Sequence, residues 1–317
     1  MTHRSRRSAV ARVATFVVVS AAVGLVVSGC SSTSTSPPLV PSSAAGSAAA
    51  SPPASATGSG PVQVLYAGSL LNLMEKTVGP AYDAATGYTF QGQGAGSGAL
   101  ATLIKGKTIR ADVFVSASPK VDATLEGTAN GDWVSWYAKF ASSDLVLGVN
   151  PKSTFAAALR SKPWYDVVGQ KGFALGSTDA LTDPKGALSV EALRNAATSE
   201  KKPELTALAK SFDNVQPEQS LVGRLQAGQL DAAFFYASEA KAAGISTVPL
   251  TGQHLKATYT ITELRGAPNP KGAEAFIAYL LGPAGQKQLT SFGYDLISPA
   301  TVTGSGVPAS LQSLLGT

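Results

Sequence analysis

The sequence of 317 residues is poor in the side chains that build metal cages, disulfides and catalytic triads. It has one cysteine and two histidines. A single cysteine cannot form an internal disulfide, and with two histidines it cannot supply the ligands of a conventional zinc or iron site. His254, the one histidine beyond the first three residues, has no acidic residue, serine or cysteine beside it. We therefore expect neither a resident cofactor nor enzymatic activity.

Charged residues are also scarce, at 14% of the chain, although the formal net charge is +5. Four of the 25 basic residues are arginines among the first 12 residues, and the first acidic residue is Glu75. Without residues 1–29 the chain has 25 − 4 = 21 basic residues against 20 acidic ones, a net charge of +1. A nearly neutral chain lacks the basic surface that binds phosphate backbones, so nucleic acid is not an expected partner.

No apolar run is long enough to cross a membrane as a helix, which takes about 20 residues. The longest run near the N-terminus, Val13 to Val27, has 15 residues and follows the arginines, a pattern typical of a secretory signal peptide. It ends in Val27-Ser28-Gly29-Cys30, which resembles a bacterial lipobox. We expect residues 1–29 to be a lipoprotein signal peptide and Cys30 to carry the lipid; the alternative is a buried free thiol. The twin arginines leave the choice between the Sec and Tat export routes open.

Residues 31–60 contain Ser, Thr, Pro, Ala or Gly at 28 of 30 positions. Such a segment has too little apolar surface to offset the entropy of ordering it. We therefore expect residues 30–60 to be a flexible linker between the lipid at Cys30 and a folded part. The protein would then be extracytoplasmic and anchored to the cell membrane.

Beyond residue 60, segments with the pattern of strands alternate with segments of helical periodicity, which favours an α/β fold. A first series begins with a strand at 62–67 and an amphipathic helix at 70–85, and a second begins with a strand at 145–149. We predict two lobes with mixed, mostly parallel sheets flanked by helices, lobe I formed by 61–143 and 252–317 and lobe II by 144–251. We expect a monomer.

Two serines follow predicted strands and open predicted helices, and each is flanked by glycine. Ser69 lies in Ala67-Gly68-Ser69-Leu70, and Ser97 lies in Gly96-Ser97-Gly98-Ala99. A helix N-terminus presents unpaired amides and a partial positive charge, and a serine adds a hydroxyl donor. Two such ends that converge would form an anion site, whereas each serine alone could be an ordinary helix cap.

The glycine-rich run from Gly92 to Gly98 does not match a dinucleotide-binding motif. Position 97, where G-x-G-x-x-G requires glycine, is serine, and no Gly-Lys-Ser/Thr follows. The glycines are better explained by a slim loop that faces a ligand.

Several motifs together resemble the periplasmic molybdate/tungstate-binding proteins of ABC importers, with the closest similarity to the tungstate-binding branch. Besides the two serine loops, the motifs are Ala111-Asp-Val-Phe-Val-Ser-Ala117, Trp133-Val-Ser-Trp-Tyr-Ala-Lys-Phe-Ala-Ser142 and Asp183-Pro-Lys-Gly186. The resemblance covers nearly all of residues 62–300. It implies a hinged, two-lobed type II solute-binding fold and a membrane permease as partner.

The resemblance also implies the residues that hold the oxyanion. They are Ser69 and Ser97 from the first lobe, Asp183 before Pro-x-Gly, Glu218, and Tyr236 near the hinge. If both face the site as ionised carboxylates, Asp183 and Glu218 would bind the metal of the oxyanion directly. Each residue also has a structural alternative: a turn cap for Asp183, a first-turn helix acid for Glu218 and a core position for Tyr236.

One departure from the family pattern concerns the aspartate. Asp179-Ala180 stands where the resemblance leads us to expect Asp-Pro, which leaves Asp179 open as an alternative ligand to Asp183. Lys185 and Arg224 could offset negative charge at the site, but the sequence does not give their orientation.

The carboxylates indicate which anion is bound. Two like charges about 4 Å apart repel by roughly 4 kcal/mol at an effective dielectric near 20, and an ionised carboxylate cannot donate a hydrogen bond. Molybdenum and tungsten can accept carboxylate oxygens as extra ligands, whereas sulfur in sulfate cannot. The leading hypothesis is therefore a receptor for tungstate or molybdate. The alternatives are a receptor for another oxyanion such as sulfate, and a secreted enzyme or cell-wall interaction protein that uses His254 or the aromatic residues Trp133, Trp136 and Tyr137.

Overall fold

The computed structural model describes residues 58–210 and 214–317. The predicted signal peptide, Cys30 and nearly all of the predicted linker lie outside these residues. Within the described ranges no helix has both the length and the apolar character needed to span a membrane.

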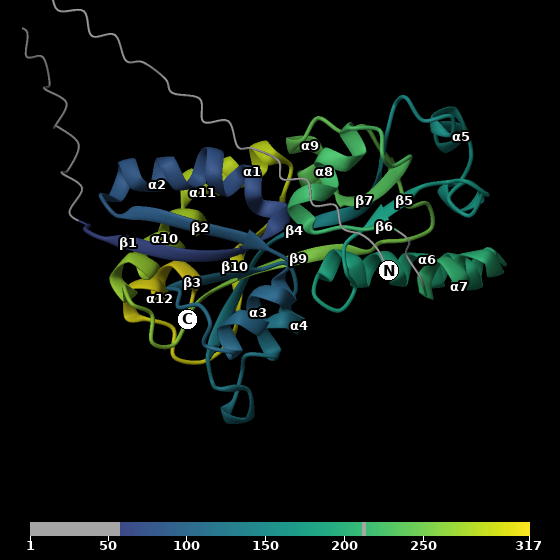
Figure 1. Ribbon diagram of the computed structural model, residues 1–317. Coiled ribbons are helices and arrows are strands. Elements are labelled where there is room, and N and C mark those ends of the chain that lie inside the picture. The colour runs from purple at the N-terminus through teal and green to yellow at the C-terminus, as the bar shows by residue number, and fades with distance from the viewer. Residues whose placement is uncertain (1–57, 211–213) are drawn as a thin grey trace, which may run out of the picture. The chain divides into compact units, whose positions relative to one another are not determined.

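Ten strands form one sheet in the described part of the chain, in the order β2-β1-β3-β9-β4-β7-β5-β6, with β8 and β10 also paired to β4 (Figure 1). The strands are β1 (Pro61–Ala67), β2 (Thr89–Ala95), β3 (Val113–Ser116), β4 (Trp136–Val149), β5 (Leu175–Ser177), β6 (Asn214–Val215), β7 (Ala232–Tyr236), β8 (Thr247–Pro249), β9 (Lys256–Glu263) and β10 (Asp295–Gly304).

The long strand β4 belongs to two halves of this sheet. Its first part pairs with β9 and β10, and its second part, from Leu145 to Val149, pairs with β7 and β8. We call β1, β2, β3, β9, β10 and the first part of β4 the first sheet half, and β5 to β8 with the rest of β4 the second sheet half. The expected mixed α/β fold is confirmed, but parallel pairs do not predominate. Parallel pairs join β1 to β2 and β3, and β5 to β6 and β7. The long strand β4 is antiparallel to each of its partners, β7, β8, β9 and β10.

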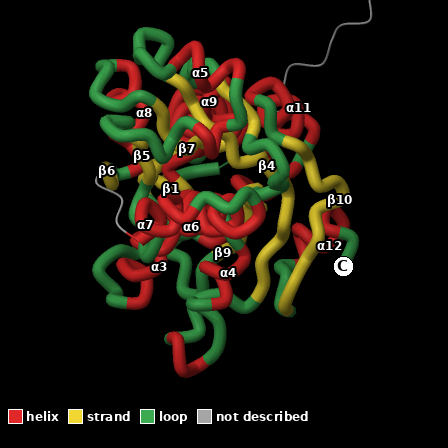
Figure 2. The backbone as a smooth tube through the Cα atoms, turned by 90° about the vertical axis from the view of Figure 1, so that its right-hand side faces the viewer, coloured by secondary structure: helices red, strands yellow, loops and turns green. Residues whose placement is uncertain are grey.

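Helices follow most strands and lie on both faces of β1 to β3, and Figure 2 shows β4 and β10 side by side. The α-helices are α1 (Leu71–Leu73), α2 (Gly79–Thr86), α3 (Ser97–Lys105), α4 (Pro119–Ala123), α5 (Ala156–Ser161), α6 (Pro184–Ser199), α7 (Pro203–Lys210), α8 (Glu218–Gln226), α9 (Ala237–Ala242), α10 (Pro270–Leu281), α11 (Pro283–Phe292) and α12 (Ala309–Leu315). The helix predicted over 70–85 forms in pieces: a 3-10 turn, η1 (Gly68–Leu70), α1, a π-helical turn, η2 (Met74–Val78), and α2.

The apolar positions predicted for that helix do face the core. Leu70, Leu73, Met74 and Val78 are buried, whereas Leu71 is only partly buried. Of the aromatic residues Trp133, Trp136 and Tyr137, the last two are buried in the core clusters and the first packs against one of them. These three side chains are therefore core residues.

Candidate functional site

The two serine loops leave the same edge of the sheet. β1 and β2 are parallel neighbours, and Ala67 at the end of β1 lies opposite Ala95 at the end of β2. The chain enters η1 at Gly68 and α3 at Ser97 directly after these strand ends. The pairing of β1 with β2 thus places the two loops side by side, as the convergence argument requires.

The serines are not N-caps, so the alternative that each is an ordinary helix cap is wrong. Gly96 is the N-cap of α3 and Ala67 that of η1, and neither position has a side-chain capping bond. Ser97 is 1% exposed, and its Oγ accepts a hydrogen bond from the Ala117 amide at 3.1 Å. Ser69 is 5% exposed, and its Oγ lies 3.0 Å from the Tyr259 hydroxyl.

Asp183 and Glu218 come from the second series of elements and meet at this site. Asp183 is the N-cap of α6, where its Oδ1 accepts from the Lys185 amide at 2.8 Å, and Glu218 is the first residue of α8. Both are buried, and they lie close enough for the charge of Glu218 to act on Asp183. Burial, together with the negative charge of Glu218, raises the pKa of Asp183 well above its ordinary value.

The glycines beside the serines allow these carboxylates to come close. A Cβ on Gly68 would lie 2.5 Å from Oε2 of Glu218, and a Cβ on Gly96 would lie 3.2 Å from Oδ2 of Asp183. Any side chain at either position would displace the carboxylate or the loop. The carboxylate of Glu218 therefore lies against the first serine loop, and that of Asp183 against the second.

A direct backbone contact joins the second serine loop to the segment before α6. The amide of Ala99, in the first turn of α3, donates to the carbonyl of Thr182 at 3.0 Å. A Cβ on Gly98 would lie 2.9 Å from that same carbonyl oxygen. The start of α3 and the segment before α6 can make this contact because Gly98 has no side chain, and the contact closes this side of the site.

Tyr236 ends β7 and is fully buried. Its hydroxyl has no hydrogen-bond partner among the described residues. Burial raises its pKa well above the ordinary value, and the charges of Asp183, Glu218 and Glu239 add to the rise. A buried hydroxyl without a partner costs free energy.

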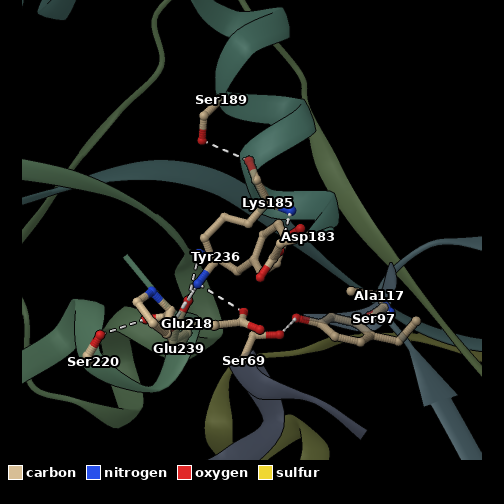
Figure 3. A network of polar contacts seen from close by, with 12 residues as sticks. Ser69, Ser97, Ala117, Asp183, Lys185, Ser189, Glu218, Ser220, Tyr236 and Glu239 are labelled. Atoms are coloured by element: carbon tan, nitrogen blue, oxygen red, sulfur yellow. Dashed lines mark hydrogen bonds and ion pairs between the residues drawn. The ribbon is translucent and has the colours of Figure 1, made fainter. Parts of the chain in front are cut away.

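The sequence did not identify the role of Lys185 and missed Glu239. Lys185 is fully buried, and its Nζ lies 3.0 Å from Oε1 of Glu218 and 2.7 Å from Oε2 of Glu239 (Figure 3). Burial alone would lower the pKa of Lys185, but the charges of Glu218, Glu239 and Asp183 outweigh it and raise the pKa above its ordinary value.

Arg224 is exposed and donates to Gln229. Glu239 carried no sequence signal beyond its place in the first turn of a helix after a buried strand.

Two cavities flank Asp183. One of about 320 Å³ lies between the loop before α3, the segment 178–183 and the start of α8, and Gly96, Asp183 and Glu218 line it. The other, of about 470 Å³, lies between residues 117–121 and 180–188. Ser69 and Ser97 line neither cavity, although the glycines next to Ser97 do. His254 is exposed in a loop and lines neither cavity.

The fold and the site together define an α/β binding protein in which two sheet halves share a strand and contribute opposite walls of one polar site. Residues 62–295 match the family of bacterial extracellular solute-binding proteins, and the chain belongs to that family.

Curated relatives include a protein of Haloferax volcanii named as an ABC transporter molybdenum-binding protein, 32% identical over 181 residues that make up 56% of each chain. The chain thus spans little more than half the length of this relative. Another relative is the molybdate/tungstate-binding protein of Pyrococcus abyssi, 23% identical over 72% of this chain and 80% of the relative.

Solved structures share the fold. The periplasmic molybdate-binding protein of Azotobacter vinelandii matches with a TM-score of 0.56 and 19% identity over 74% of this chain and 98% of its own. The sulfate-binding protein SubI of Mycobacterium tuberculosis matches with a TM-score of 0.59 and 17% identity over 81% of this chain and 92% of its own.

Proposed function

We propose that this protein is the extracytoplasmic receptor of an ABC importer, that it captures tungstate or molybdate between two lobes, and that it delivers the anion to a membrane permease. Lobe I would consist of 61–143 and 252–317, and lobe II of 144–251. The protein would be exported by the signal at residues 1–29 and held at the membrane by a lipid on Cys30. The curated relatives support this proposal because two of them are named for molybdenum, molybdate or tungstate.

One observation carries the choice of anion. Asp183 and Glu218 are buried together, and each presents a carboxylate oxygen to one of the serine loops. An anion without an expandable centre would meet two carboxylates that can only repel it when ionised. An anion whose central metal accepts further oxygens turns the same carboxylates into ligands.

The remaining residues would hold the oxo groups of the anion. Ser69, Ser97 and Tyr236 supply hydroxyl donors, and the first turn of α3 supplies backbone amides and the positive end of the helix dipole. The ligand would touch both lobes, so it would stabilise the closed arrangement by its differential affinity for it. No covalent chemistry is assigned to the site, in keeping with relatives that are named as binding proteins.

Calorimetric titration of the purified protein with tungstate, molybdate, sulfate and phosphate tests the proposal. We expect binding of one or both metal oxyanions and weak or no binding of sulfate and phosphate. Absence of heat with both metal oxyanions would refute it. Sulfate binding that survives Glu218→Ala unchanged would instead favour a sulfate receptor, the function for which the Mycobacterium tuberculosis structure is named.

A second measurement tests the coordination itself. X-ray absorption at the tungsten edge of the complex should show more oxygen donors than free tungstate has. An unchanged tetrahedral spectrum would mean that Asp183 and Glu218 do not bind the metal.

A further inference from the structure

Lys185 contacts both carboxylates of the site through different groups. Its backbone amide donates to Oδ1 of Asp183 at 2.8 Å, and its side-chain Nζ lies 3.0 Å from Oε1 of Glu218. Both contacts come from one residue in the first turn of α6, so the positions of the two carboxylates are coupled. The contact with Asp183 is made by the backbone and that with Glu218 by the side chain, so replacing the Lys185 side chain releases Glu218 alone.

These contacts leave one particular oxygen on each carboxylate for a ligand. Oδ2 of Asp183 faces Gly96, and Oε2 of Glu218 faces Gly68. Because Oδ1 and Oε1 are held by Lys185, the carboxylates cannot turn these other oxygens away from the serine loops without breaking a buried hydrogen bond or ion pair. The result is a pair of oxygens presented in a fixed direction.

The Lys185 ammonium also has contacts other than the one with Glu218. Glu239 on α9 binds it through Oε1 at 2.9 Å and Oε2 at 2.7 Å. The rings of Phe235 and Tyr236 lie 5.5 and 5.6 Å from Nζ, within the range of cation–π attraction. Since Lys185 is fully buried, this environment sets a single orientation for the side chain.

We propose that Lys185 is the positioning residue of the oxyanion site: it does not touch the anion but fixes the two carboxylate oxygens that bind the metal. This inference rests on the proposed function. Residues that hold the ligands of a metal in position, without binding the metal themselves, typically contribute about 10- to 100-fold to metal affinity.

The competing explanation is that Lys185 only balances charge. Asp183, Glu218, Glu239 and Lys185 together carry three possible negative charges and one positive charge. Lys185→Met changes this balance by one unit, and the double variant Lys185→Met/Glu239→Gln restores it. If only charge matters, the double variant should bind like the wild type. If position matters, it should remain impaired because the Glu218 carboxylate has lost its partner.

The experiment is tungstate titration by calorimetry of the full folded chain at one fixed pH, with thermal unfolding of each variant as the check on folding. We expect Lys185→Met and the double variant both to lose about 10- to 100-fold in tungstate affinity. The control variant Arg224→Met removes the same unit of charge from an exposed position on α8, the helix that begins with Glu218. Because exposed charges have small effects, we expect its tungstate affinity to lie within about threefold of the wild type.

The double variant carries the test if Lys185→Met does not fold, because it neutralises one of the two buried carboxylates that Lys185→Met leaves without a partner. Tungsten-edge absorption of its complex should show fewer oxygen donors than the wild-type complex. Wild-type affinity and an unchanged donor count in the double variant would overturn the positioning role. A wild-type protein that binds neither tungstate nor molybdate would overturn the proposed function instead, which keeps the two failures distinct.

Discussion

Asp179 and Asp183 lie four residues apart but have different surroundings. Asp179 is exposed, and its Oδ1 accepts from the amides of Leu181 and Thr182, which shapes the loop before α6. Asp183 is buried, and its carboxylate lies near that of Glu218. At the scale of the residue, the geometry favours Asp183 over Asp179 as the proposed ligand.

The first prediction compares these two aspartates. Asp183→Asn keeps the shape of the side chain but replaces an anionic oxygen that would bind the metal, so tungstate affinity should fall by roughly 10- to 100-fold, or about 1.5–3 kcal/mol. Asp179→Asn retains an oxygen for the two loop amides and should leave the affinity unchanged. Calorimetric titration measures both, and a larger loss in Asp179→Asn would reverse the assignment.

A buried aspartate outside the site predicts how stability depends on pH. Asp122 in α4 is fully buried; Thr260 Oγ1 donates to its Oδ2 at 2.6 Å, while Oδ1 has no partner among the described residues. Burial raises the pKa of Asp122 from its ordinary 3.8 to about 7. Between these values the folded protein keeps a proton that the unfolded chain releases. Stability therefore falls as pH rises from about 4 to about 7, and is constant with respect to this group above that.

The second prediction follows from this sign. Asp122→Asn removes the titration, so the variant should be more stable than wild type at pH 8, by up to about 4 kcal/mol, and the difference should shrink toward pH 4.5. Urea unfolding of both proteins at the two pH values gives the comparison. Parallel pH profiles of wild type and variant would show that Asp122 does not titrate in this window.

Residues that meet across long sequence separations explain what the sequence could not predict about the site. Ser69, Ser97 and Asp183 could be named from local motifs, and Glu218 and Tyr236 from the resemblance to the family. The partners of Ser69 and Lys185 could not: Tyr259 is 190 residues from Ser69, and Glu239 is 54 residues from Lys185. Only the folded sheet brings such pairs together.

At the scale of the element, the short segments beside the strands decide how closely the two walls of the site approach. The loop before α3 contacts the segment before α6 through backbone atoms at Ala99 and Thr182. Residues with a side chain can adopt the backbone conformation of Gly98, so the helix itself does not require glycine there. The close contact with Thr182 does require it.

The third prediction concerns this contact. Gly98→Val should hold the Thr182 carbonyl away from α3, because its Cβ would start only 2.9 Å from that oxygen. Overpacking of this kind costs about 1–3 kcal/mol, which should appear as roughly 5- to 150-fold weaker tungstate binding. Gly223→Val on α8 is the matched control, since nothing lies within 4 Å of its added Cβ. Equal affinities of the two variants, measured by calorimetry, would show that the close approach is not needed for binding.

Elements with a clear local pattern were predicted well, and elements without one were missed. The strand at 62–67 and the helical segment from residue 70 are confirmed. β4 was predicted only from Leu145 onward, yet it begins at Trp136. Ser142 and Ser143 interrupt its apolar pattern but are buried; Ser142 pairs with both β9 and β10, and Ser143 pairs with β9. Pairing over long sequence distances made a strand where the local pattern did not indicate one.

At the scale of the whole molecule, the proposed lipid on Cys30 would hold the protein at the membrane in which the proposed permease lies.

The fourth prediction tests the anchor. In cells that process bacterial lipoproteins, the wild-type chain should incorporate labelled fatty acid and fractionate with membranes. Cys30→Ser should do neither, because it lacks the thiol that receives the lipid, while its tungstate affinity should match the wild type. Labelling that persists in Cys30→Ser would place the lipid elsewhere.

The chain passes between the two sheet halves within β4 and returns just before β9, whose first residue Lys256 still pairs with Asp144 of β4. A gene cut at residue 144 would therefore sever a strand in mid-ladder and expose hydrogen-bonding edges on both fragments. We therefore expect that neither fragment folds alone. A shortened or circularly permuted protein would have to keep both connections between the sheet halves, the one within β4 and the one before β9.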